Sequence, residues 1–163
     1  MSDIHMPTAR QAYTHTLRVT FAYDAKDVKV ARVLRVAMRA PAPALPAPSG
    51  KTVGFWLEVE DAAGKALYHF PIHDPMRQDQ EVFNDPEGGK PVRAPSRQTS
   101  GEFEILVPDL PSGGRFVLHG TPRGVRAPAR MSHAASTPLV THSLDELRRL
   151  AAETARKPRG GRP

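Results

Sequence analysis

The residues with the most chemical potential in this sequence are its seven histidines, because imidazole binds metal ions and exchanges protons near neutral pH. No two of them form an H-E-x-x-H or His-x-His motif, and no two stand at i, i+4 on an expected helix. They are scattered along the chain at His5, His15, His69, His73, His119, His133 and His142. Their spacing by itself therefore predicts no metal site.

His73 is followed directly by Asp74, which makes this the most suggestive pair of the sequence. A carboxylate beside a histidine can orient the ring for metal binding or proton transfer, so one hypothesis is a metal-dependent enzyme that uses these two residues. The competing interpretation is structural, because Asp74-Pro75 is a common start of a turn. We favour the turn.

Other catalytic arrangements are missing from the sequence. Nucleophilic hydrolases need a serine activated by a histidine and an acid, and no Gly-x-Ser-x-Gly motif occurs. The Ser112-Gly113-Gly114 segment is better explained as a hairpin turn, and no glycine pair is followed by the lysine and helix of a phosphate-binding loop. We therefore predict a protein that is not an enzyme and that needs no cofactor.

The chain contains no cysteine, which excludes disulfide bonds, zinc–thiolate sites and thiol nucleophiles. Residues 1–12 lack the apolar segment of a signal peptide and are expected to form a flexible leader. No apolar run approaches the roughly 18 residues that a membrane helix needs. Together these features predict a cytoplasmic protein without membrane insertion.

Positive charge is concentrated in the C-terminal third. The chain has a formal net charge of +6, yet residues 1–114 carry a net charge of −1 and residues 115–163 a net charge of +7. An alternative function is therefore binding of nucleic acid or another acidic surface. Because no aromatic residue follows His119, such binding would be weak and salt-sensitive. The arginines that would carry it are Arg123, Arg126, Arg130, Arg148 and Arg149.

Short strands are expected throughout, because 17 prolines and 12 glycines interrupt the chain. Thr16–Tyr23 alternates apolar and polar residues with period two. Val28–Met38 does so with a change of parity that predicts a bulge near Ala31–Val33. Further strands are predicted at Glu102–Val107 and Arg115–His119.

The clearest unit is a β-hairpin of Thr52–Glu60 and Ala66–Phe70, joined by a short turn that contains Gly64. By parity, Trp56 points away from the apolar face of the first strand. An exposed tryptophan marks a binding surface, and Tyr68 would extend it if it lay on the same side. The alternative, which we favour, is that a loop or the C-terminal helix covers Trp56.

The connections are long. Residues 40–50 form a Pro/Ala connector that is expected to be stiff, extended and unpacked, and to cross between two sheets. Residues 71–100 form a long polar loop that includes a possible short edge strand at Glu81–Phe83. Residues 121–142 form a basic loop.

A helix is predicted over residues 143–157, because Ser143 and Glu146 match a capping box and Leu144, Leu147 and Leu150 form an apolar stripe. Residues 158–163 form a disordered tail. The elements predict one domain over residues 13–120, an all-β, immunoglobulin-like antiparallel β-sandwich of six to eight strands, followed by this helix.

Several segments resemble uncharacterised bacterial proteins that look like small sandwich modules of multi-component systems. The resemblance is carried by residues 54–68, Ile72–Pro75, Glu81–Phe83 and Val107–Pro111. It covers about residues 15–120 and implies an accessory module, without an activity or site residues.

The function that we predict is a non-catalytic module of a bacterial multi-component system that binds or scaffolds another protein, including a second copy of itself as a homo-oligomer. A sheet edge, the 71–100 loop or the Trp56 face would make the contact, for example by strand addition. The helix would either cover the sandwich or dock on the partner. The candidate residues are Trp56, Tyr68, His73, Phe83, Leu144, Leu147 and Leu150.

Overall fold

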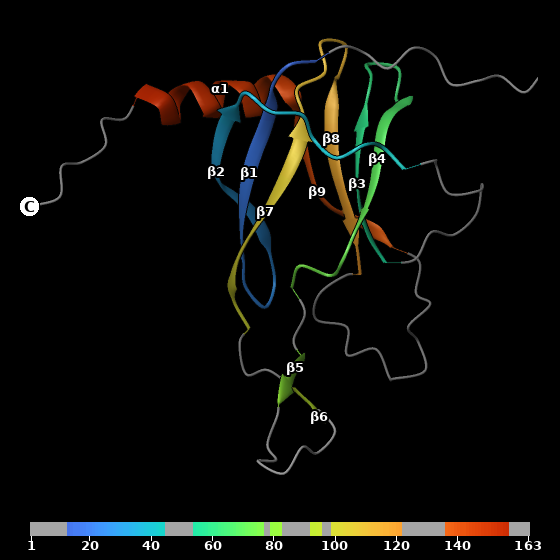
Figure 1. Ribbon diagram of the computed structural model, residues 1–163, viewed down its shortest axis with the longest axis vertical. Coiled ribbons are helices and arrows are strands. Elements are labelled where there is room, and N and C mark those ends of the chain that lie inside the picture. The colour runs from blue at the N-terminus through green and yellow to red at the C-terminus, as the bar shows by residue number, and fades with distance from the viewer. Residues whose placement is uncertain are drawn as a thin grey trace, which may run out of the picture.

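The computed structural model describes residues 13–44, 54–76, 79–82, 92–95, 99–121 and 136–156, and of residues 79–82 and 92–95 it describes the backbone alone. The described residues form two antiparallel sheets that face each other, a separate two-stranded ribbon and a C-terminal helix (Figure 1). The prediction of an all-β sandwich with a terminal helix is therefore confirmed, although its immunoglobulin-like detail is not.

Sheet A contains three strands in the order β2-β1-β7. They are β1 (Thr16–Tyr23), β2 (Val28–Val36) and β7 (Gly101–Pro108). The first strand lies in the middle of the sheet, whereas the immunoglobulin order A-B-E-D places the second strand between its neighbours. The predicted bulge is present, because Thr20 pairs with Arg32 and Phe21 with Val30, which leaves the residue between those two β2 positions without a partner.

Sheet B contains four strands in the order β4-β3-β8-β9. The hairpin of β3 (Phe55–Glu60) and β4 (Ala66–Ile72) is confirmed, and its turn contains Gly64 with a φ of 82°. β8 (Arg115–Gly120) joins β3 to β9 (Thr137–Ser143). The prediction of a continuous loop over residues 121–142 is wrong from Thr137 onward, because β9 lies there.

The core lies between the two sheets. Phe21 of sheet A is fully buried and stacks on Phe103 and on Phe116, with ring centroids 5.2 Å and 6.0 Å apart. Leu57 and Val59 meet them from the other sheet and are 1% and 0% exposed. Alternation places each of these side chains on the inner face of its strand, which explains why the sequence pattern was informative.

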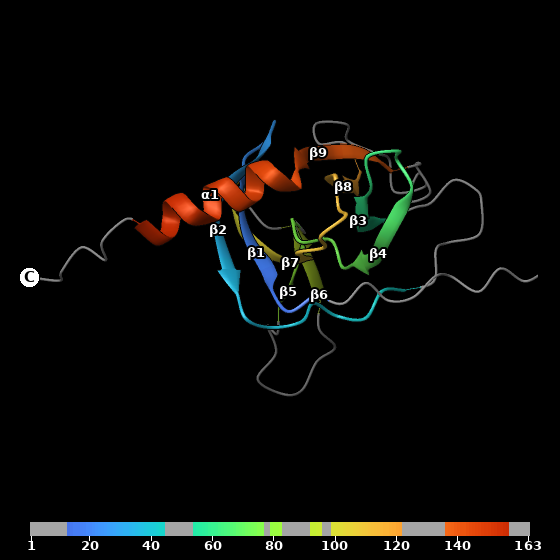
Figure 2. The ribbon, with the colours of Figure 1, turned by 90° about the horizontal axis from the view of Figure 1, so that it is seen from above.

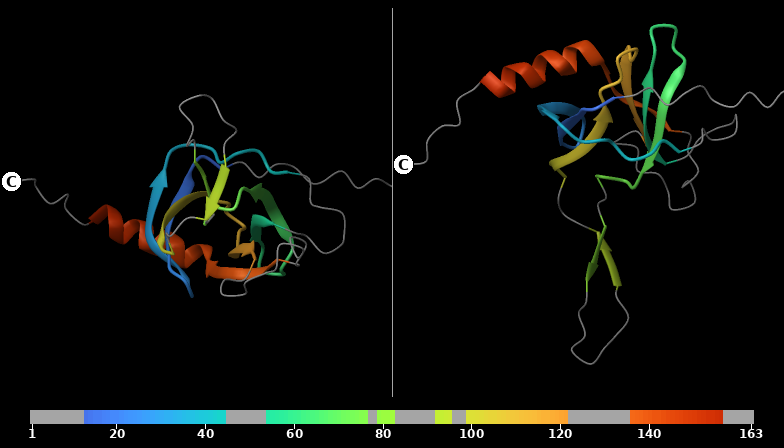
Figure 3. Two further views of the ribbon diagram at one scale, coloured as in Figure 1. Left: turned by 90° about the horizontal axis from the view of Figure 1, so that it is seen from below. Right: turned by 45° about the horizontal axis from the view of Figure 1, so that its top comes forward.

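Residues 71–100 contain more structure than one predicted edge strand. β5 (Asp79–Val82) and β6 (Val92–Pro95) pair antiparallel and form a ribbon of their own. This ribbon projects away from the two sheets (Figure 3). It connects the end of β4 to the start of β7.

The helix α1 (Leu144–Arg156) closes one side of the sandwich by packing mainly on β2 (Figure 2). Leu144 and Leu147 are fully buried in the common core. The N-terminus of the helix is capped as predicted, since the amide of Glu146 donates a hydrogen bond of 3.0 Å to Oγ of Ser143. Within the described residues, no helix is long and apolar enough to cross a membrane.

Asp109 ties the helix to sheet A. Its carboxylate accepts a hydrogen bond of 2.8 Å from Nε of Arg35 on β2 and one of 2.7 Å from Nε of Arg148 on α1. Arg148 also donates to the carbonyl oxygen of Leu110, at 2.8 Å. A turn, a strand and a helix are thus held together by one buried carboxylate.

Residues 38–44, here called the strap, cross from sheet A to sheet B on the side opposite the helix (Figure 2). The hydroxyl of Thr16 donates to the carbonyl of Met38 at 2.7 Å, and the hydroxyl of Tyr68 donates to the carbonyl of Pro41 at 2.9 Å. Ala40 is only 8% exposed. The prediction of a crossover is confirmed for this part. The prediction that the connector is unpacked is wrong over residues 40–44, because Ala40 is buried, Pro41 accepts a hydrogen bond from Tyr68, and Ala44 donates one to His69.

Candidate binding site

Two of the four outer edges of the sheets are obstructed. On β2, a bulge interrupts the strand, Lys29 and Arg32 are exposed, and α1 packs beside it. Bulges and charged side chains are the usual means by which a sheet edge avoids pairing with another strand. On β9, Pro138 removes a backbone donor near the start of the strand.

The β4 edge is also partly used. Pro71 lacks an N–H group, and the amide of Ala44 in the strap donates a hydrogen bond of 2.9 Å to the carbonyl of His69. A second strand could not pair along the whole of β4 without displacing the strap.

The β7 edge is different. Its eight residues pair one-to-one with β1 without a register shift, and it contains no proline before its last residue, Pro108. Sheet A continues no further on this side in the described part of the chain. In an antiparallel strand, alternate residues direct N–H and C=O groups away from the paired neighbour, so β7 offers backbone donors and acceptors to another strand.

An apolar hollow of about 240 Å³ lies beside this edge, between β7 and β4. Aliphatic and aromatic side chains from both sheets form most of its lining, and the middle of the strap and the segment after β4 complete it. The lining residues are Pro41, Leu57, Phe70, Ile72, His73, Pro75, Glu104, Ile105 and Leu106. Sheet A has three strands and sheet B has four, so beyond β7 the fourth strand of sheet B has no strand of sheet A opposite it. A further strand paired with β7 would direct its inward side chains into the hollow.

A second group of polar residues lies on the outer face of sheet B. Trp56 stacks on His119 with ring centroids 4.6 Å apart and an interplanar angle of 9°, and Nε2 of His119 lies 3.5 Å from Oε2 of Glu58. Nε2 is buried and has no hydrogen-bond partner among the residues that the structure describes. His69, which pairs with Glu58 across the strands, completes the group.

Burial sets the protonation of this group. It lowers the pKa of His119 from its usual 6.5, against the opposing effect of Glu60, and the nearby His69 lowers it further. Burial also raises the pKa of Glu58. The described residues contain no set of three or more His, Asp or Glu side chains that could hold a metal ion. The arrangement is therefore a neutral imidazole packed against an indole ring and a carboxyl group.

Trp56 points to the outer face, as parity predicted, and is 8% exposed, so it is covered rather than free. Tyr68, which would have extended this surface if it lay on the same side, does not lie there. Tyr68 pairs with Val59 and lies on the core face, 3% exposed. Neither His69 nor His119 was predicted as a neighbour of Trp56. His119 follows from alternation along β3 and β8, whereas His69 reaches this face only because of the bulge in the β3–β4 hairpin.

The helix residues proposed for a partner are used within the domain. Leu144 and Leu147 are 0% exposed, and Leu150 lines a shallow groove between β2 and α1 together with Val30 and Glu153. Of the two alternatives for this helix, covering the sandwich is therefore the one that the structure shows. Phe83 lies outside the described residues.

His73 is exposed at the rim of the hollow, and Oδ1 of Asp74 accepts a hydrogen bond of 2.9 Å from the amide of Met76. Asp74 therefore caps a turn, which is the structural interpretation of this pair. Arg148 is engaged by Asp109 and Asp145, whereas Arg149 is exposed. The other proposed arginines, Arg123, Arg126 and Arg130, lie outside the described residues.

Comparisons with protein-family models, curated proteins and solved structures found no match to this chain.

Proposed function

We propose that this chain is a protein-binding module whose partner docks on the side of the sandwich between β4 and β7. The observation that carries the proposal is the regular, eight-residue β7 edge beside an apolar hollow. Backbone groups at an open edge give affinity to an extended segment, and a hollow beside it gives specificity through alternate side chains.

The ribbon of β5 and β6 also favours docking on the side of the sandwich between β4 and β7. β5 and β6 make their substantial contacts with each other rather than with either sheet. A lone two-stranded ribbon is marginally stable in water, so it gains from a surface to pack on. Because it joins β4 to β7, a partner bound at the hollow would lie next to it.

The two leucines that flank Arg18 on the outer face of sheet A provide a matched test. Leu106 on β7 and Leu34 on β2 both pair with Arg18 and are both half-buried, but Leu106 borders the hollow and Leu34 lies at the obstructed edge. Leu106→Lys places a charge where the partner would dock, and we expect it to reduce partner binding at least tenfold. Leu34→Lys makes the same chemical change and should leave binding intact.

The measurement is affinity capture from nuclease-treated lysate of the source cells with each full-length variant, followed by quantitative mass spectrometry. Thermal unfolding of the purified variants checks that both remain folded. A protein captured by the wild type and by Leu34→Lys but lost from Leu106→Lys supports the proposal. The same proteins captured by all three forms would contradict it.

A further inference from the structure

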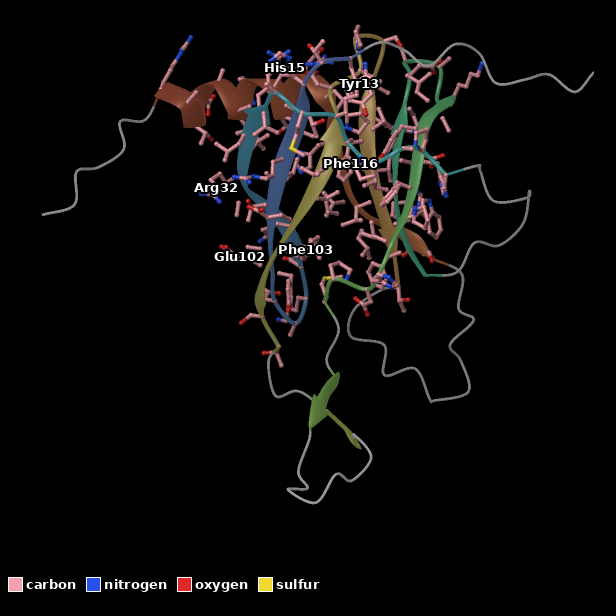
Figure 4. All side chains as sticks on the ribbon, viewed as in Figure 1. Tyr13, His15, Arg32, Glu102, Phe103 and Phe116 are labelled. Carbon is pink, nitrogen blue, oxygen red and sulfur yellow. The ribbon has the colours of Figure 1, made fainter. Side chains whose placement is uncertain are left out.

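The outer face of sheet A has an ordered charge pattern. On β1, Thr20 pairs with Arg32 on one side and Glu104 on the other. Two residues further along β1, Ala22 pairs with Lys29 and Glu102 in the same way. Each row of three paired residues across β2, β1 and β7 therefore begins with a base at the β2 edge and ends with an acid at the β7 edge. Figure 4 labels one member of each row, the base Arg32 of the first and the acid Glu102 of the second.

The two glutamates differ in how far they are neutralised. Glu104 lies 3.8 Å from Arg18 and 3.5 Å from Arg32, and it accepts a hydrogen bond of 3.1 Å from Thr20. The carboxylate of Glu102 is exposed and has no ion pair or side-chain hydrogen bond with any residue that the structure describes. The β7 edge thus offers net negative charge on its outer face.

The inner face of the same strand is apolar. Phe103 packs on Phe21, and Ile105 is 6% exposed and borders the hollow. Leu106 lies on the outer face, where it pairs with Arg18, and it also borders the hollow. From Glu102 to Leu106 the edge therefore reads acidic, apolar, acidic, apolar, apolar.

Resting on the proposed function, we infer that the partner contributes an extended strand with alternating apolar and basic residues, which pairs antiparallel with β7. Directly opposed side chains of unlike charge stabilise neighbouring strands, and like charges destabilise them. An antiparallel strand opposite Leu106 through Glu102 would read, from its N-terminus, apolar-apolar-basic-apolar-basic. The antiparallel direction follows the rest of the sheet, in which every pair is antiparallel.

A second copy of this chain fits the edge poorly in the register that is centred on Phe103. Antiparallel pairing of two β7 strands about Phe103 would place Glu102 of one copy opposite Glu104 of the other, twice per dimer. A basic partner strand avoids this repulsion, because its basic residues lie opposite Glu102 and Glu104.

The probe is a labelled, capped peptide with the core Val-Ile-Lys-Val-Lys and soluble Gly/Ser flanks, titrated with the full chain by fluorescence anisotropy at low salt. Three control peptides replace both lysines by glutamate, replace both lysines by serine, or place proline at the central position. We expect the basic peptide to bind about tenfold more tightly than the acidic one, since both lysines would face glutamates of β7, whereas two glutamates at the same positions would be repelled by them. The proline peptide should not bind, because it lacks a ladder donor.

Charge reversal at Glu102 tests whether this residue faces the basic residue of the peptide. Glu102→Lys should weaken the basic peptide several-fold and strengthen a peptide with glutamate at the facing position. Lys29→Glu changes a charge in the same row at the other edge and should affect neither peptide. Both positions are exposed, so neither change threatens the fold.

Each outcome is decisive. Preference for the basic peptide that inverts in Glu102→Lys supports the inference. Equal binding of acidic and basic peptides, equal binding of the proline peptide, or no binding of any peptide overturns it. If the peptides fail while Leu106→Lys still abolishes protein capture, the proposed function stands and only the chemistry of the partner strand is wrong.

Discussion

Trp56 and His119 stack face to face, and Trp56 is the only tryptophan of the sequence. Its fluorescence therefore responds mainly to the protonation of His119, because a protonated imidazole quenches a stacked indole more strongly than a neutral one. The ring of His69 lies further from Trp56, at 6.2 Å, and is tilted by 40° rather than stacked. The groups that face His119 are Glu58 at 3.5 Å and, acting at longer range, Glu60 and His69.

We expect the fluorescence to fall on acidification with a midpoint below pH 6.5, because burial lowers the pKa of His119. His119→Gln should remove this transition. His15→Gln changes a histidine at the start of sheet A and should leave it unchanged. A midpoint at or above pH 6.5 in the wild type would contradict the burial argument.

The lowered pKa of His119 also makes the stability of the fold depend on pH. Below pH 6.5 the unfolded chain protonates this histidine before the folded chain does, so the contribution of His119 is fully present above pH 6.5 and is lost as the pH falls through the folded-state pKa. Glu58, whose pKa is raised, acts in the opposite direction. Comparison with His119→Gln isolates the histidine.

At the scale of the elements, the position of α1 depends on Asp109. Its side chain is 7% exposed and receives hydrogen bonds from Arg35 and Arg148. Burial tends to raise the pKa of Asp109, but these hydrogen bonds prevail and lower it from its usual 3.8. The clamp is therefore present above that pH and is lost as the pH falls through the lowered value.

Asp109→Asn keeps the shape and removes the charge, which leaves Arg148 without its buried partner. We expect the free energy of unfolding to fall by about 2 kcal/mol, the range for hydrogen bonds to charged groups. Arg35→Gln removes the half-exposed partner and should cost less than about 1 kcal/mol. Urea unfolding followed by circular dichroism measures both, and equal losses in the two variants would show that Asp109 is no clamp.

Elements with clean alternation were predictable from the sequence, and interrupted ones were not. β1 has the bounds that its period-two pattern indicated, because one face is fully buried. β9 was missed because Pro138 stands inside it and its core contribution is the single buried residue Val140. Its strand character comes from pairing with β8, which no local pattern encodes.

Tyr68 shows how one bulge alters a candidate site. Glu60 pairs with Ala66 and Val59 with Tyr68, so Leu67 is an extra residue in the hairpin. Without it, Tyr68 would pair with Glu58 and lie on the face of Trp56, which is the alternative that the sequence left open. One inserted residue moves every later side chain to the other face, and it replaces Tyr68 by His69 beside Trp56.

At the scale of the whole molecule, the sandwich is closed by α1 and partly crossed by the strap, and no described strand pairs with the outer edge of β7 (Figures 1 and 2). An open edge of this length tends to pair with copies of itself. The acids of β7 oppose such pairing, because Glu102 and Glu104 of two copies would face each other.

We therefore expect removal of this repulsion to cause self-association. The double substitution Glu102→Thr and Glu104→Thr keeps the strand-forming character of β7 and replaces four opposed charges per dimer, so a monomer–dimer equilibrium or larger assemblies should appear at concentrations where the wild type is monomeric. Sedimentation or light scattering over a concentration series measures this. Lys29→Thr with Arg32→Thr makes the same change in the same two rows at the β2 edge and should leave the chain monomeric, since the bulge and α1 still obstruct that edge. If the β7 variant stays monomeric, charge repulsion is not what prevents self-association through this edge.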